Sequence, residues 1–526
     1  MGKKFGAILL AAALVFSGVS AAQAAAKVGA SCSKAGQTVK AAGTTLKCTK
    51  VGKKLVWQKG KNAASSAPAK FKEMDKCQPT SDLVIGNAQS GRLVYLSCGP
   101  DGRLHPQNGA PEIDQATGQP IKGPLGANIM STDYFNPPSI KTKPASALSD
   151  FGSEVTPCKI ADAGAKGDIP NNPQRHFATG FPLYPDRAKL DEKTVVQFVP
   201  VDFADLKGKR SPAVDWVDTA KFLKQFWELQ GSKEIKLDIR IPDEYTHLPK
   251  PVLDYDLAAD FFKTGKPPQG TFDYSRAAIA AIDSKIDFSD VDIVAVVPPA
   301  EASKEQVRSF TAEAAEPTRG FKSAEKEIMN LLVSPGKPVT PYEFLTWVHE
   351  FGHMLGLSDL RNVPKASAQD SSPLGVFDVM NSFSALEILA WQRFLLGTIA
   401  DNQVNCISQA GTFTSWMTPL EARDNGVKLT VIPTGKYTAI AVESRRSYGF
   451  DFNLGSANNG LIVYKLDTSI PYYKSALQIV PSPSATDNEW RRDAALKKGE
   501  SVTVDGVTIT NVETGAFGDV AKIEKK

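Results

Sequence analysis

Two histidines four residues apart carry the clearest chemistry in this sequence. His349 and His353 enclose the run His-Glu-Phe-Gly-His, with Glu350 as its second residue. Residues four positions apart lie on one face of an α-helix, so both imidazoles can bind one metal ion. Glu350 would lie beside that ion without binding it, where a general base can take a proton from a water that the metal acidifies. The spacing therefore predicts a hydrolytic zinc (Zn²⁺) site.

A third ligand is expected just beyond this helix. Gly356 suits the left-handed conformation that ends a helix, and the turn could bring the carboxylate of Asp359 back to the histidines. Three protein ligands would then leave a fourth position open to water. The alternative is a stable amphipathic helix whose histidines only contact their neighbours. The chain has only five histidines in 526 residues and two stand at this spacing, which favours the metal site.

The helix that carries the histidines has its own signals. Thr340 is a suitable N-cap, Pro341 suits the first helical position, and Glu343 completes a capping box. Apolar residues recur at helical spacing on the side away from the metal, and they should face a core: Phe344, Val348, Phe351 and Leu355. Gly352 costs about 1 kcal/mol relative to alanine inside a helix, which indicates close packing against the backbone.

These residues together resemble a known family of enzymes. The run 349–359, followed by Phe-Asp-Val-Met-Asn-Ser at 377–382, is similar to the metzincin zinc peptidases. The segment 385–397 and the region 442–451 are similar to the immune inhibitor A family of secreted bacterial metallopeptidases. The resemblance implies that Met380 is the methionine of a turn that supports the metal by packing. It also implies calcium (Ca²⁺), although no acidic loop matches a calcium-binding motif.

Two positions depart from the metzincin pattern. Asp359 stands where most metzincins carry a third histidine, although some secreted bacterial relatives have an aspartate there. Ser382 stands where some metzincins place a tyrosine that stabilises the oxyanion. The residue that would stabilise the oxyanion therefore stays unassigned.

The start of the chain predicts export from the cell. Lys3 and Lys4 precede the apolar run 5–16, and small residues follow to Ala24, where we expect a signal peptide to be cleaved. The apolar run is shorter than the roughly 20 residues that a membrane span requires. A secreted protein, extracellular or attached to the cell surface, is therefore expected.

Secretion makes the six cysteines candidates for disulfides, because the sequence contains no C-x-x-C pair. Six cysteines allow 15 connectivities, so several pairings stay open. The preferred pairs are Cys32 with Cys48, Cys77 with Cys98, and Cys158 with Cys406.

Charge is unevenly spread along the chain. The net charge is +4, but residues 27–76 contain 12 lysines against Glu73 and Asp75, so the remainder is acidic. The basic segment could bind an anionic cell-wall or membrane surface, or it could be a soluble tether. It contains no arginine and few aromatic residues, which argues against nucleic acid as a partner.

Six segments follow from these patterns. They are a signal peptide (1–24), a small basic Cys-containing module (27–60), a linker (61–76), an irregular Gly/Pro-rich region with a propeptide as one interpretation (77–153), a zinc metallopeptidase domain (154–400) and a β-sandwich domain (401–526). Strands are expected at 194–201, 235–241 and 291–297, helices at 219–229 and 274–282, and further strands at 427–432, 437–442, 460–464 and 501–510. Pro200 should interrupt the first of these strands.

The predicted fold class is therefore an α+β multidomain protein: a metzincin-like zinc peptidase domain followed by an all-β sandwich and preceded by a disulfide-stapled module. The predicted function is a secreted zinc endopeptidase that cleaves extracellular proteins or peptides. A catalytically silent surface-binding protein and a zinc hydrolase of peptidoglycan peptides remain alternatives. His176 and His247 could also contribute to the site, although isolated histidines are more often structural.

Overall fold

The computed structural model divides the chain into two compact units, Met1–Ala67 and Pro68–Lys526. It describes residues 30–32, 34–41, 44–51, 54–59, 71–77, 84–88, 91, 93–98, 103–106, 113, 140–164, 177–258, 270–303, 305–307, 311–314, 321–334, 336–338, 341–361, 373–382, 387–447, 449–451, 454–471 and 474–526. The predicted signal peptide, His176 and Thr340 lie outside these residues. Within the described part, no helix has both the length and the apolarity to cross a membrane.

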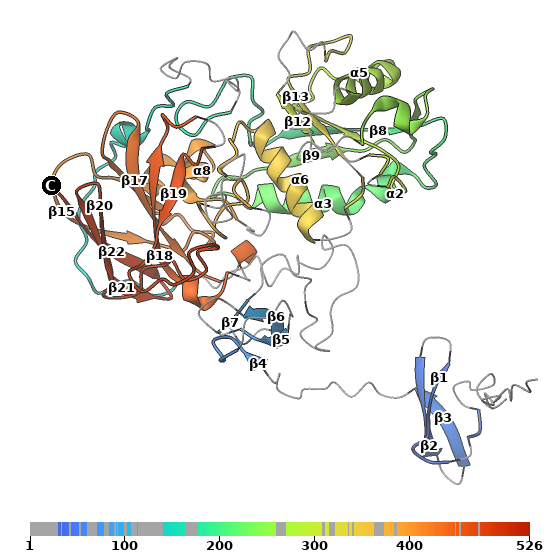
Figure 1. Cartoon of the computed structure of the whole chain (residues 1–526), viewed down its shortest axis with the longest axis horizontal. Helices are drawn as coiled ribbons and strands as arrows, with labels where there is room; N and C mark the ends of the chain where they lie inside the picture. Colours follow the sequence, from blue (N-terminus) through green and yellow to red (C-terminus); the bar gives the residue numbers. More distant parts are fainter. Residues whose placement is uncertain are drawn as a thin grey trace, which may run out of the picture. The chain divides into compact units, whose positions relative to one another are not determined.

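The first unit is a small three-stranded antiparallel sheet (Figure 1). A disulfide ties the segment before the sheet to its central strand. Its strands are β1 (Thr38–Ala41), β2 (Thr44–Val51) and β3 (Lys54–Lys59). The predicted bond between Cys32 and Cys48 is confirmed, and Trp57 packs beside it in the small core. The strand β1 was not anticipated from the sequence.

A second small sheet opens the other unit. Its order is β4 (Phe71–Lys72), β5 (Val84–Asn87), β6 (Leu93–Cys98) and β7 (Leu104–Pro106). The strand β4 falls within the range expected to be a linker. Cys77 is disulfide-bonded, but the side chain of its predicted partner, Cys98, lies outside the described residues.

A six-stranded, mostly parallel sheet underlies the histidine helix. Its strands are β8 (Thr194–Asp202), β9 (Leu237–Arg240), β10 (Thr246–His247), β11 (Ile293–Val297), β12 (Thr311–Ala314) and β13 (Asn330–Val333). The order is β10-β8-β11-β13-β12, and β9 also pairs with β8. Only β12 runs antiparallel to its neighbour, and it forms one edge of the sheet beside the histidine helix.

Helices cover both faces of this sheet. They are α2 (Pro212–Asp215), α3 (Val217–Glu228), α5 (Gly270–Ile282) and α6 (Pro341–Met354). Side chains of β8 alternate between two apolar clusters, with Phe198 in the one that includes α3 and α6 and Val199 in the one that includes α5. Figure 1 shows α5 on the side of the sheet opposite to α3 and α6. The histidine helix is therefore held between a sheet and further core.

The expected interruption of β8 at Pro200 is wrong. The strand continues to Asp202, with Pro200 in register with Val297 of β11. On its other side, β8 pairs with β9 up to Gln197 and with β10 from Val201 onward. Pro200 thus lies in the gap between two partner strands, where its missing N–H group breaks no ladder on that side.

The chain beyond residue 400 forms two sheets after the short helix α8 (Ala390–Leu395). The five-stranded sheet has the order β14 (Val404–Cys406), β16 (Leu429–Pro433), β17 (Thr438–Arg445), β18 (Gly460–Asp467) and β19 (Leu477–Val480). The four-stranded sheet has the order β15 (Gly411–Met417), β22 (Gly518–Lys525), β21 (Val507–Gly515) and β20 (Ser501–Val504).

The single strand predicted at 501–510 is wrong. Residues of this range form the hairpin β20–β21, with Asp505 and Gly506 at its turn and both at positive φ. An Asp-Gly pair is a strong hairpin signal because both turn residues must adopt the left-handed conformation.

The five-stranded sheet is buried on both faces. On β17, Ala439 and Ala441 lie in the cluster that contains α6, whereas Ile440 and Val442 lie in the cluster shared with the four-stranded sheet. The predicted disulfide between Cys158 and Cys406 is confirmed, and it ties the segment before β8 to this sheet. The two predicted domains thus share one continuous core, which agrees with the single compact unit Pro68–Lys526.

Candidate metal centre

The helix α6 ends in the way that the sequence predicts. Gly356 has a φ of +95°, its N–H donates to the carbonyl of His353, and the N–H of Leu357 donates to the carbonyl of Gly352. This pair of bonds is a Schellman motif, which reverses the chain at the helix end. The chain then returns past the two histidines toward Asp359.

The three predicted ligands come together in the interior. Their ligand atoms all lie within 4.8 Å of one another, and His349, His353 and Asp359 are all buried. Nε2 of His349 lies 3.2 Å from Asp359 Oδ1, and Nε2 of His353 lies 3.5 Å from Asp359 Oδ2. Among the residues that the structure describes, this is the one such group of three that could hold a metal ion.

Both imidazoles are oriented for ligation. Nδ1 of His349 donates to the carbonyl of Val379 at 2.9 Å, and Nδ1 of His353 donates to the carbonyl of Leu357 at 2.8 Å. A carbonyl only accepts, so each Nδ1 carries the hydrogen, and a neutral ring then has its lone pair on Nε2, facing Asp359. Hydrogen bonds of this kind fix the rings of metal-binding histidines. The donor set therefore fits a divalent ion.

Asp359 is held in place by its own neighbours. The next residue, Leu360, donates its N–H to the carbonyl of Met380 at 3.0 Å, and Nε of Arg361 lies 3.4 Å from Asp359 Oδ1. Burial would raise the pKa of Asp359, but the adjacent His353 and His349 hold that pKa well below its usual range. The carboxylate is thus ionised, as a metal ligand must be.

Glu350 lies beside the group without belonging to it. It is half-buried, whereas the three ligands are buried. Burial lowers the pKa of His353, but the negative charges of Asp359 and Glu350 outweigh this and raise that pKa. Glu350 therefore acts on the site at short range and keeps access to solvent, as a general base requires.

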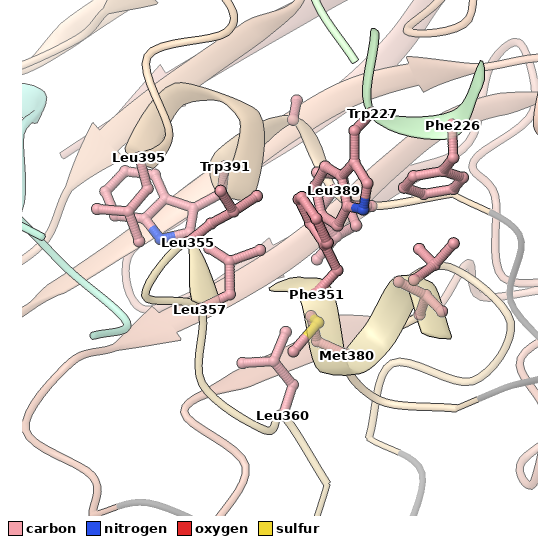
Figure 2. Packing of buried hydrophobic residues seen from close by; sticks show 14 of the residues in the cluster. Phe226, Trp227, Phe351, Leu355, Leu357, Leu360, Met380, Leu389, Trp391 and Leu395 are labelled. Carbon is pink, nitrogen blue, oxygen red and sulfur yellow. The ribbon is translucent and has the colours of Figure 1, made fainter. Parts of the chain in front are cut away.

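Met380 packs directly against the histidine helix. It is fully buried in the cluster that also contains Phe351 and Leu360 (Figure 2). A Cβ atom built on Gly352 would lie 2.7 Å from Met380 Sδ, so a larger residue there would require the buried Met380 side chain to shift. The close approach that the helical glycine predicted is confirmed.

The turn that contains Met380 is stabilised by Asp378. The carboxylate of this buried residue accepts hydrogen bonds from the N–H groups of Met380, at 2.7 Å, and Leu389, at 2.9 Å. Burial raises the pKa of Asp378 to about 7. We refer to residues 377–382 as the methionine turn; through the Val379 carbonyl it orients His349.

Two other residues singled out in the sequence, His247 and Ser382, lie outside the three-ligand group. His247 is an exposed residue of β10 whose Nδ1 lies 2.8 Å from Asp202, and it is not part of the three-ligand group. Ser382 donates its N–H to the carbonyl of Asp378 and so belongs to the turn that contains Met380. The carbonyls of Val379 and Leu357 were not anticipated, because a backbone group has no side-chain signal.

No protein-family model matches this chain, and no curated protein matches it.

Proposed function

We propose that this protein is a secreted, zinc-dependent endopeptidase. The observation that carries the proposal is the convergence of His349, His353 and Asp359 in the interior, with half-buried Glu350 beside them. Two imidazoles and one carboxylate are a usual set of protein ligands for catalytic zinc. Export rests on the signal sequence at 1–24, and the resemblance to immune inhibitor A-like metzincins supports the choice of reaction.

The chain's own residues would act as follows. His349, His353 and Asp359 hold the ion, and zinc in such a site supplies a Lewis acid that polarises a carbonyl and acidifies water. Glu350 accepts a proton from the attacking water and then donates it to the leaving amine nitrogen. The carbonyls of Val379 and Leu357 keep both imidazoles aligned throughout.

The edge strand β12 is the candidate binding surface for a peptide substrate. In the described part of the chain, β12 pairs only with β13, and α6 packs against it. An extended peptide can add to such an edge through main-chain hydrogen bonds, which depend little on sequence. This arrangement favours a protein or peptide substrate over a small molecule.

The test compares the wild-type protein with Glu350→Gln, and it uses His247→Ala as a control outside the group. We expect one zinc per chain in all three proteins and hydrolysis of casein by wild type and control only. Loss of zinc is expected instead for Asp359→Ala. A wild-type protein that binds zinc but cleaves neither casein nor peptidoglycan peptides, even after proteolytic trimming, would refute the proposal.

The first unit favours a second role in attachment. Residues 27–72 contain no acidic residue, and Lys34, Lys47, Lys50 and Lys54 are exposed on or beside its sheet. We propose that this unit binds an anionic surface by long-range attraction. Wild-type protein should sediment with isolated cell walls at low salt and a triple Lys→Gln variant at 47, 50 and 54 should not. Equal sedimentation would leave the unit as a soluble tether.

A further inference from the structure

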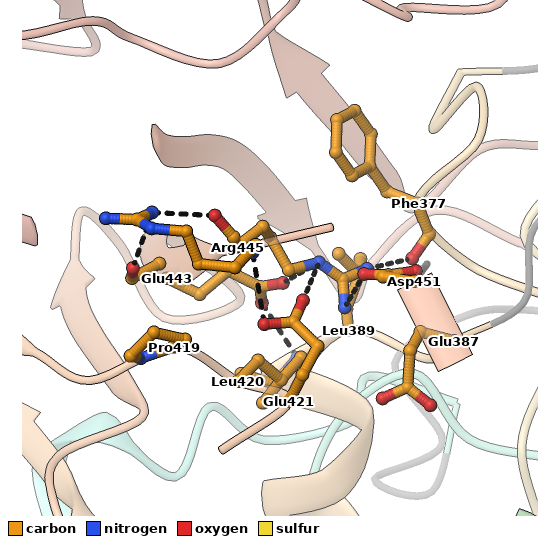
Figure 3. A network of polar contacts seen from close by, with 12 residues as sticks. Phe377, Glu387, Leu389, Pro419, Leu420, Glu421, Glu443, Arg445 and Asp451 are labelled. Carbon is orange, nitrogen blue, oxygen red and sulfur yellow. Dashed lines mark hydrogen bonds and ion pairs between the residues drawn. The ribbon is translucent and has the colours of Figure 1, made fainter. Parts of the chain in front are cut away.

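Arg445 is a fully buried arginine at the end of β17. Burying a guanidinium group costs free energy unless acceptors meet its N–H groups and its charge. Three buried carboxylates surround it (Figure 3), and all three come from residues 401–526, which we call the β-sheet region. Nε lies 3.2 Å from Glu443 and 3.9 Å from Glu421, and Nη1 lies 3.2 Å from Asp451. Its charge is therefore balanced within the β-sheet region.

One donor of Arg445 reaches outside that region. Nη2 donates a hydrogen bond of 2.6 Å to the carbonyl of Phe377, the first residue of the methionine turn (Figure 3). A carbonyl has no formal charge, so balancing the charge of Arg445 does not account for this bond. The planar fork of arginine spreads five N–H donors over three nitrogens, so it can reach the carboxylates and this carbonyl from one position, whereas lysine directs its three donors from a single nitrogen.

The strand β17 also holds Ala390, which lies at the other end of residues 377–390. Oε2 of Glu443 accepts hydrogen bonds from the N–H of Ala390, at 2.7 Å, and from the hydroxyl of Tyr464, at 2.8 Å. Residues 443 and 445 lie on one face of β17 because strand side chains alternate. Between the two anchor points, Asp378 ties Met380 to Leu389. The described residues 377–382 and 387–390 are thus tied to β17 and, through Asp378, to each other.

We propose that Arg445, together with Glu443, is a positioning residue of the metal centre. It fixes the Phe377 carbonyl, and thereby keeps the Val379 carbonyl 2.9 Å from Nδ1 of His349. The imidazole then keeps its Nε2 directed at the ion. This inference rests on the proposed function for the identity of the ion. The hydrogen bond by which Arg445 fixes the methionine turn does not depend on that function.

Loss of the guanidinium would loosen both ends of the segment. Burial raises the pKa of Glu443, and the positive charge of Arg445 counteracts that rise. Without this charge, the pKa of Glu443 would rise further, and a protonated Glu443 is a weaker acceptor for the N–H of Ala390. Arg445→Met therefore removes one anchor and weakens the other.

The test uses Arg445→Met, Arg445→Lys and, as a matched control, Arg446→Met. Arg446 is the next residue, and its bonds to Asp519, Gly515 and Gly518 stay within the β-sheet region. We expect Arg445→Met to weaken zinc binding roughly 10- to 100-fold in a chelator competition, as second-shell losses do. The value of kcat should fall with little change in KM. Arg446→Met should retain wild-type zinc affinity.

Hydrogen exchange gives a readout that needs neither zinc nor activity. In metal-free protein, peptides that cover residues 377–390 should exchange faster in Arg445→Lys than in wild type, but not in Arg446→Met. Arg445→Lys keeps the positive charge, so it tests the proposal if Arg445→Met does not fold. The proposal would be overturned if the variants of Arg445 kept the wild-type exchange rate and zinc affinity. It would also be overturned if Arg446→Met changed both quantities as much as the variants of Arg445 do. A wild-type protein that binds no zinc would refute the proposed function, while the exchange result would still decide the role of Arg445.

Discussion

Gly352→Ala tests how tightly the methionine turn is packed on the histidine helix. Alanine gains about 1 kcal/mol over glycine inside a helix. Against this, its Cβ would lie 2.7 Å from Met380 Sδ and 3.3 Å from Met380 Cε. Overpacking of a filled core costs about 1–3 kcal/mol, and Met380 is fully buried. We therefore expect a net loss of about 1 kcal/mol in the free energy of unfolding, together with roughly 10-fold weaker zinc binding.

Urea unfolding can measure this through the tryptophans Trp227, Trp347 and Trp391, which lie in the same cluster. Met380→Ala alone should cost about 2–5 kcal/mol because it leaves a cavity. In the double variant, the methyl group added at position 352 enters part of that space. The double variant should therefore lose less stability than the sum of the losses in the two single variants. A Gly352→Ala protein more stable than wild type, or strictly additive losses, would refute the close packing.

Three further outcomes follow from the structure. The raised pKa of Asp378 contributes stability that is complete below about pH 4 and is lost as the pH rises through about 7. Between pH 5 and pH 8, wild type should therefore lose about 3 kcal/mol more of its free energy of unfolding than Asp378→Asn. Equal losses of the two proteins in urea unfolding would contradict this. Cys158 and Cys406 are 248 residues apart, so replacing both with alanine should cost about 5 kcal/mol, and a loss below about 1 kcal/mol in the same assay would contradict it. Zinc at 100 times its Kd should stabilise the chelator-treated protein by about 2.7 kcal/mol in thermal unfolding, and Asp359→Ala should show no such gain.

The metal ligands were predictable because their geometry is local. His349 and His353 share a helix face, and Gly356 ends that helix, so Asp359 could return to them within a few residues. The two confirmed disulfides were preferred choices among 15 connectivities, and the preference for Cys158 with Cys406 came from the expected domain order.

The supports of the site were not predictable, because they join residues far apart in the sequence. Arg445 meets Phe377 across 68 residues, and Glu443 meets Ala390 across 53. Charged residues at the end of a strand are usually exposed, so nothing in the run Glu-Ser-Arg-Arg indicates complete burial. Such long-range contacts depend on the packing of whole layers.

The five-stranded sheet did carry a signal of its burial on both faces. Its strands contain near-continuous apolar runs, such as Leu-Ile-Val-Tyr at 461–464, whereas a sheet with one solvent face alternates apolar and polar residues. That pattern argues against a β-sandwich standing apart from the rest of the chain. The boundary expected at residue 401 is accordingly not a break in the apolar core.

This doubly covered sheet makes the two halves of the chain interdependent. Fragments that end or begin near residue 400 would each present a broad apolar surface to water, so each should aggregate when produced alone. Mixed during refolding, the fragments should recover a soluble complex. A split at this point would therefore give a reconstitution assay in which zinc binding reports that the halves have joined.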